Sequence, residues 1–154
     1  MAISRQFVTA AVLLFVSSAA TASAVHDELA KFLFPRGLLP DSVASYSIDG
    51  NGNFKVLLPS PCYVQLSDLI YYDTTIKGRI SYGLISDLSG VEMRKFFIWA
   101  QITSISANKE RGTLDFYTGL ISERLSASMF AEIPHCKNGY GEILPEDALH
   151  ISED

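Results

Sequence analysis

Histidines and cysteines are the residues of this sequence best suited to acid–base or nucleophilic chemistry. The three histidines are His26, His135 and His150, and the two cysteines are Cys62 and Cys136. His135 stands beside Cys136, but adjacent residues of an extended chain point to opposite sides, which disfavours a Cys/His catalytic pair. The G-x-S-x-G motif that carries the nucleophilic serine of many hydrolases is absent. The residue types and their spacing therefore identify no catalytic residue.

Carboxylates that could form a general acid and base pair are scattered through the chain. A glycosidase needs two of them flanking the scissile bond, and the candidates are Asp68, Asp73, Glu92 and Asp115. Each falls in an expected strand or turn, where a solvated position on the surface is the usual role of an acidic side chain. No grouping of His, Cys, Asp and Glu has the spacing of a metal site. We therefore expect neither a metal nor a cofactor.

Aromatic residues form a group with a different potential role. Its members are Tyr63, Tyr71, Tyr72, Tyr82, Phe96, Phe97 and Trp99. Such side chains either fill a small core or line an apolar pocket inside a β-roll, which would suit a lipid or a tetrapyrrole-like ligand. The residues expected to line the pocket are Tyr63, Tyr82, Phe97, Trp99 and Phe116. The basic residues that either frame its mouth or form a solvated face are Lys77, Arg79, Arg94 and Lys95.

The composition is that of a single folded domain. The chain has 154 residues, of which 48% are hydrophobic and 19% charged, and its formal net charge is −5. The length fits one domain, and the hydrophobic share argues against disorder. A negatively charged chain lacks the basic stripe that meets nucleic-acid phosphates. We expect a monomer that does not bind nucleic acid.

The first 24 residues have the three regions of a secretory signal peptide. Arg5 precedes a mostly apolar segment at 7–16 that is too short to span a bilayer, and Ala22-Ser23-Ala24 is a signal peptidase site. No later apolar run is long enough for a transmembrane segment. The sequence therefore predicts a secreted protein whose mature chain starts at Val25.

The two cysteines fall in the mature chain. An oxidising compartment favours one disulfide between Cys62 and Cys136, and the alternative is two buried free thiols. Because no C-x-x-C spacing is present, a zinc site is not expected.

The hydrophobic periodicity predicts one short helix followed by strands. The helix is expected at His26–Phe34 and is ended by Pro35 and Gly37. A period of two then predicts strands at 43–49, 54–59, 63–66, 69–73, 76–85, 91–106 and 113–121, with a hairpin turn at 49–52. The segment 91–106 is apolar on both faces in its middle, which predicts a central strand.

Two short segments complete the predicted domain organisation. Ser126 is expected to cap a helical turn at 127–132, and the acid-rich residues 137–154 are expected to form a flexible tail. The predicted fold is an all-β domain over residues 25–136, a single sandwich, roll or barrel-like sheet of about eight short strands with a short N-terminal helix.

Six short motifs between about residues 27 and 136 resemble the plant domain of unknown function 538 family. They are Gly37-Leu38-Leu39-Pro40, Ser60-Pro61-Cys62, Tyr72-Asp73, Ile76-Lys77-Gly78-Arg79-Ile80, Leu88-Ser89-Gly90-Val91 and Pro134-His135-Cys136. The resemblance implies a small β-rich roll or barrel, found in land plants and often secreted, without an agreed activity. The chain departs from the family pattern at Phe116-Tyr117-Thr118-Gly119, where an acid or valine is expected before the glycine.

The resemblance and the residues together leave three functions open. The family has been likened to lipid-binding bactericidal/permeability-increasing proteins, and chlorophyll binding or hydrolysis and roles in stress and growth have been proposed for it. The first function is binding of an amphipathic ligand, either a lipid or a chlorophyll-like molecule, in stress or growth responses. The second is hydrolysis of chlorophyll-type esters, with His135 as the base. The third is a non-catalytic interaction in the cell wall or secretory pathway.

Overall fold

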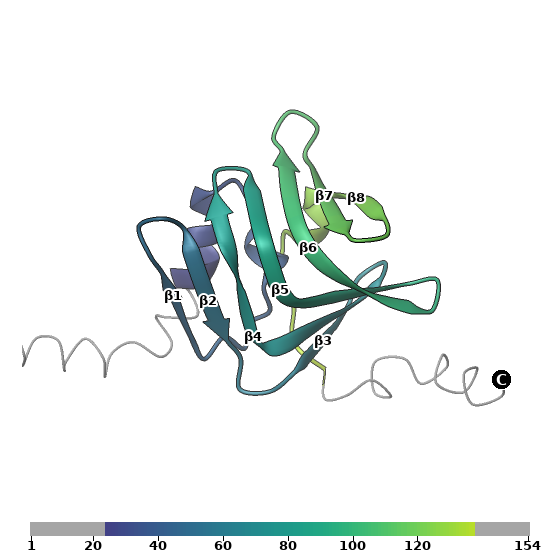
Figure 1. Cartoon of the computed structure of the whole chain (residues 1–154), viewed down its shortest axis with the longest axis horizontal. Coiled ribbons are helices and arrows are strands. Elements are labelled where there is room, and N and C mark those ends of the chain that lie inside the picture. Colours follow the sequence, from purple (N-terminus) through teal and green to yellow (C-terminus); the bar gives the residue numbers. More distant parts are fainter. Residues whose placement is uncertain (1–23, 138–154) are drawn as a thin grey trace, which may run out of the picture.

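A computed structural model describes residues 24–137 of the chain. They form one antiparallel sheet of eight strands, a helix at residues 24–31 and two short 3-10 helices (Figure 1). The predicted all-β fold with a short N-terminal helix is thereby confirmed. The predicted signal peptide, 1–24, and acidic tail, 137–154, lie outside the described residues except for residue 24 and residue 137.

The strands follow one another in the sheet with one exception. The order is β1-β2-β4-β5-β6-β7-β8, and β3 pairs with β4 beside β2. The elements are η1 (Arg36–Leu38), β1 (Ser45–Ile48), β2 (Asn53–Leu57), β3 (Cys62–Gln65), β4 (Leu69–Ser81), β5 (Leu84–Lys95), β6 (Ile98–Asn108), β7 (Thr113–Thr118), β8 (Ser122–Ser126) and η2 (Ala127–Phe130).

The sheet is curved because its longest strands are interrupted by bulges. The first part of β4 pairs with β3 and its second part pairs with β2. The β4–β5 register shifts between Tyr72 and Lys77, and Gly90 of β5, opposite this point, has a φ of +95°. A Cβ on Gly90 would lie 2.3 Å from the carbonyl oxygen of Thr75. The bulge therefore requires glycine there, and it bends the sheet.

The N-terminal helix ends at residue 31, before the predicted end at Phe34. The amide of Leu33 donates to the carbonyl of Ala30, and the amide of Phe34 donates to that of Leu29. This pair of hydrogen bonds is a Schellman motif, with Leu33 in the left-handed region at a φ of +76°. The chain then turns back so that Phe34 is buried with Val25 and Leu29 in the core. The helix lies behind β1, β2 and β4 (Figure 1) and covers the inner face of the sheet.

The predicted central strand at 91–106 is wrong, because this segment is a hairpin. The strand β5 ends at Lys95, the strand β6 begins at Ile98, and Phe96 and Phe97 form the turn between them. Both phenylalanines have a positive φ, which is unusual for a bulky residue, so the sequence carries no turn signal at this point. The apolar character of both faces reflects exposed side chains at a turn rather than a doubly buried strand.

Two other predicted boundaries also differ. The predicted strand 76–85 contains the turn between β4 and β5, where Ser81 pairs with Leu84 across Tyr82 and Gly83. The segment at 87–90, which lies between two predicted strands, is part of β5. Asp87 and Gly90, both with positive φ, lie at the two register shifts of the β4–β5 pairing. Such bulges use the same residue types as turns and therefore have the same sequence signature.

Gly37 allows η1 to approach η2 closely, and its replacement tests that contact. A Cβ on Gly37 would lie 2.2 Å from the carbonyl oxygen of Glu132. Gly37→Ala is expected to lower the free energy of unfolding by about 1–3 kcal/mol, since two backbone segments must separate. Thermal or urea unfolding measures the loss. Gly50→Ala is the control because nothing lies within 4 Å of its Cβ position, and an equal loss in both variants would contradict the contact.

Within residues 24–137, no helix is long and apolar enough to cross a membrane. Within the same range, no group of three or more His, Cys, Asp or Glu side chains is arranged to hold a metal ion.

Candidate ligand cavity

An apolar cavity lies between the curved sheet and the N-terminal helix. Its volume is about 70 Å³. The helix, the residue after it and the connector supply Val25, Glu28, Leu29, Phe32, Leu38 and Leu39. The strands and η2 supply Tyr46, Ile48, Phe54, Val56, Ile70, Tyr72, Ile76, Ile80, Ile85, Leu88, Val91, Ile102, Ile105, Phe116 and Phe130.

The wall of the cavity offers almost no polar group to a ligand. Tyr72 is buried, and its hydroxyl donates to the carbonyl oxygen of Leu38 at 2.8 Å. Burial raises the pKa of Tyr72 well above its usual range, so the phenol stays protonated and keeps donating this bond. Among the described residues that line the cavity, Glu28 alone is charged. An apolar space of this kind stays dry and favours an apolar occupant.

Glu28 gives the cavity one polar boundary. Its carboxylate accepts a hydrogen bond from Nζ of Lys31 at 3.1 Å, one turn along the exposed side of the helix. The side chain of Lys31 is exposed. The cavity therefore combines an apolar interior with a charged pair at the helix that covers it.

Phe116 and Phe130 form one part of the cavity wall. Their ring centroids are 5.7 Å apart, and both side chains are almost completely buried. Phe116 faces inward from β7, and Phe130 is held at the end of η2, which is capped by the hydroxyl of Ser126. The predicted cap at Ser126 is thereby confirmed, although the helical turn covers 127–130 rather than 127–132.

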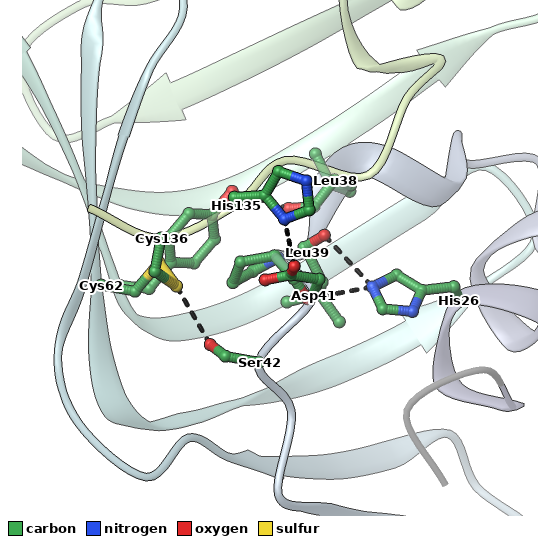
Figure 2. The surroundings of a disulfide bond; sticks show 10 residues. His26, Leu38, Leu39, Asp41, Ser42, Cys62, His135 and Cys136 are labelled. Atoms are coloured by element: carbon green, nitrogen blue, oxygen red, sulfur yellow. Dashed lines mark hydrogen bonds and ion pairs between the residues drawn. A yellow bond between two sulfur atoms is a disulfide. The ribbon is translucent and has the colours of Figure 1, made fainter. Parts of the chain in front are cut away.

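The cover of the cavity is attached to the domain by a buried histidine. His26 lies in the N-terminal helix, and its Nε2 is 3.0 Å from the carbonyl oxygen of Pro40 and 3.2 Å from that of Leu39. Figure 2 shows the imidazole pointing at this segment. His26 is buried and therefore ties the helix to the connector, rather than presenting a base to solvent.

A disulfide joins β3 to the segment that follows the last strand, and the residues after the connector contact the same segment. Cys62 of β3 is bonded to Cys136, which confirms the favoured pairing over two free thiols. The Ser42 hydroxyl lies 3.0 Å from the sulfur of Cys136, and the side chains of Asp41 and His135 form a hydrogen-bonded pair (Figure 2). The segment before the strands is therefore held against the segment that follows them.

The residues considered for nucleophilic catalysis have other partners. The sulfur of Cys136 is committed to the disulfide and cannot act as a thiolate nucleophile. His135 is largely exposed, pairs with Asp41 and is not part of the cavity lining. His150 lies outside the described residues.

The five predicted pocket residues are placed at four different positions. Phe116 lines the cavity. Tyr63 and Trp99 pack together away from it, with ring centroids 6.3 Å apart. Tyr82 is 66% exposed in the β4–β5 turn, and Phe97 is 85% exposed in the β5–β6 turn.

The charged candidates lie outside the cavity. Lys95 contacts Asp68 and Glu123, and Arg124 forms two hydrogen bonds to Asp115, one from Nε at 2.8 Å and one from Nη2 at 3.3 Å. Burial and a hydrogen bond with Glu123 raise the pKa of Asp68. The hydrogen bond from Arg124 lowers the pKa of Asp115. Lys77, Arg79, Arg94, Asp73 and Glu92 also do not line the cavity.

Sequence reasoning missed most of the cavity wall. The lining residues of β4 and β5, such as Ile76, Ile80 and Ile85, alternate with polar neighbours and are indistinguishable in sequence from solid core. The residues predicted to line the pocket were chosen because they are aromatic. The type of a side chain does not determine which face of the sheet it lies on. For Phe116, the alternation of Leu114 and Phe116 against Asp115 is the signal that places its side chain on the inner face.

The comparison with known proteins identifies a family but no activity. Residues 25–131 match the family described as "Protein of unknown function, DUF538". No curated protein is similar enough to the chain to count as a match.

Proposed function

Since the chain belongs to the DUF538 family, whose description assigns no function, we propose a function from its cavity: the protein is secreted and binds an amphipathic ligand. The apolar part of the ligand occupies the cavity, and its polar part lies at Glu28 and Lys31. The apolar wall beneath the Glu28–Lys31 pair on the helix is the observation that supports this proposal. The disulfide is compatible with secretion.

The size of the cavity favours a chain-like ligand over a planar macrocycle. At about 70 Å³, it is smaller than an engineered cavity of about 150 Å³ that accommodates benzene. A longer acyl chain enters only if the helix at 24–31 moves away from the sheet. A chlorophyll ring would require a much larger displacement. Lipid is therefore the favoured ligand class in this proposal, and chlorophyll is the second.

Binding can be tested with protein purified from plant cells that express all 154 residues. The protein is incubated with a membrane lipid extract or with chlorophyll, separated from unbound material and examined by native mass spectrometry. We expect a bound lipid, and recovery from the culture medium with Val25 as the first residue. Absence of any bound species would contradict the binding proposal, and retention inside the cell would contradict secretion. A cleaved ester in the eluate would instead favour hydrolysis.

A cavity-filling variant tests where the ligand lies. Val56 is buried and lines the cavity, whereas Val43 is buried but does not line it. Val56→Phe is expected to reduce the bound fraction by roughly tenfold or more, since the ring occupies the space of the ligand. Val43→Phe is the matched control and is expected to retain binding. Circular dichroism verifies that both variants fold, and equal binding by both would place the ligand elsewhere.

A further inference from the structure

Two turns at one end of the sheet expose large apolar side chains. Phe96 and Phe97 of the β5–β6 turn are 79% and 85% exposed, and Ile98 beside them is 57% exposed. In the turn between β7 and β8, Leu120 is 80% exposed and Ile121 is 38% exposed. These five residues are called the apolar tip below.

Lys95 holds the two turns at the same end of the molecule. Its Nζ lies 2.5 Å from the carboxylate of Glu123, near the β7–β8 turn, and 3.5 Å from that of Asp68, between β3 and β4. Figure 1 shows the β5–β6 hairpin extending beyond its neighbours at this end of the sheet. The β5–β6 part of the apolar tip is therefore a projection, with Leu120 and Ile121 set behind it on the neighbouring turn.

The backbone of the β5–β6 turn is unfavourable for the residues it contains. Lys95 pairs with Ile98, so Phe96 and Phe97 are the two turn residues, with φ of +53° and +67°. Two-residue turns with both φ positive favour Asn-Gly or Asp-Gly, because a side chain is strained in that conformation. Each ring contacts a neighbouring cation, Arg94 beside Phe97 and Lys95 beside Phe96, but neither ring is buried in the core. Such a departure from local preference points to a role for the rings outside the domain.

Basic and amphipathic side chains lie directly behind the turn. The guanidinium of Arg94 is 5.6 Å from the ring centroid of Phe97, and Arg94 pairs across the hairpin with Trp99. Trp99 packs against Tyr63 and Tyr71. At about 3.4 Å per residue, Arg94 and Trp99 lie roughly 7–10 Å behind the end of the turn. A bilayer has the same order, with an acyl region followed by a headgroup layer that favours Trp, Tyr and Arg.

We propose that the apolar tip inserts into the surface of a phospholipid bilayer, where Arg94 meets lipid phosphates. The tip presents roughly 500–600 Å², taking about 200 Å² for an aromatic side chain. A standard protein interface buries about 800 Å² on each partner, which argues against a second copy or another protein as the occupant. A bilayer accepts a projecting tip without a complementary surface. The proposal does not depend on a ligand in the cavity.

Vesicle binding tests the proposal, and the protein contains its own reporter. Trp99 is the single tryptophan of the chain and lies close behind the tip. Protein from cells that express all 154 residues is mixed with vesicles of phosphatidylcholine, or of phosphatidylcholine with phosphatidylglycerol. We expect co-sedimentation with the vesicles and a blue shift of tryptophan emission. Protein that neither sediments nor changes its emission with either vesicle would overturn the proposal.

A double variant removes the rings without weakening the hairpin. Phe96→Asn with Phe97→Gly installs the dipeptide preferred in this turn, and is expected to reduce vesicle affinity by roughly a hundredfold, about tenfold for each buried ring. The matched control is Tyr82→Asn, since Tyr82 is exposed in the two-residue β4–β5 turn and is also followed by glycine. The control is expected to bind like the parent, and an equal loss in both variants would overturn the assignment to the tip.

Two further measurements separate a bilayer from the other occupants. Arg94→Gln is expected to weaken binding to vesicles with phosphatidylglycerol about fivefold, and an unchanged affinity would overturn the role of Arg94. Light scattering reports the oligomeric state of the parent and the double variant. A dimer that forms through the tip without vesicle binding would overturn the proposal in favour of a second copy. Val56→Phe is expected to keep vesicle binding. A failure of the cavity proposal can therefore be distinguished from a failure of the membrane proposal.

Discussion

Replacing Cys62 and Cys136 together with alanine is expected to lower the free energy of unfolding by about 4–5 kcal/mol. The two residues are 74 positions apart, and the disulfide therefore restricts a long loop in the unfolded chain. In the chain-entropy treatment, closing a loop of this length reduces the unfolded-state entropy by an amount equivalent to that energy. Most single domains have a total stability of about 5–15 kcal/mol, so the loss approaches complete unfolding.

Urea unfolding of the parent and the double alanine variant measures this effect. Reduction of the parent with a thiol serves as the matched control, because it opens the same loop without changing a side chain. Both treatments are expected to shift the midpoint in the same direction. The thermal midpoint of Ser42→Ala is expected to remain close to that of the parent, since its contact with Cys136 does not close the loop. A double variant as stable as the parent would show that the disulfide contributes nothing to stability.

Phe116→Ala is expected to cost about 3–5 kcal/mol of stability, the range observed for removal of a buried aromatic ring. Phe116 is 2% exposed, packs on Phe130 and lines the cavity. Because a space already exists beside it, the surrounding side chains have little opportunity to close over the lost ring. The variant is therefore expected to retain an enlarged apolar cavity.

Tyr117→Ala is the matched control for this variant. Tyr117 follows Phe116 in β7, points to the other face and is 39% exposed, so its loss is expected to cost less than about 1 kcal/mol. Calorimetry measures both thermal midpoints. A small apolar molecule such as benzene is expected to raise the midpoint of Phe116→Ala more than that of the parent. The absence of any such increase would indicate that the cavity collapses.

The fold class was predictable because strand alternation and turn residues are local signals. The hairpin turn at 49–52, with β1 and β2 on either side, was confirmed for this reason. The turn at Phe96 and Phe97 was not predictable, since two phenylalanines at positive φ contradict the local preference on which such predictions rest. Gly90 falls between two predicted strands but belongs to a bulge inside β5, because a bulge and a turn use the same glycine conformation.

By itself, the amino-acid sequence determined an all-β domain, a short helix before it and two cysteines in a plausible pair. Only the tertiary structure decided which apolar residues enclose a cavity and which protrude. Phe116 and Phe97 are the same residue type, yet Phe116 lies on the inner face of a curved sheet and Phe97 at the end of a hairpin. That difference depends on bulges, sheet curvature and the position of the helix, which arise from contacts between distant parts of the chain.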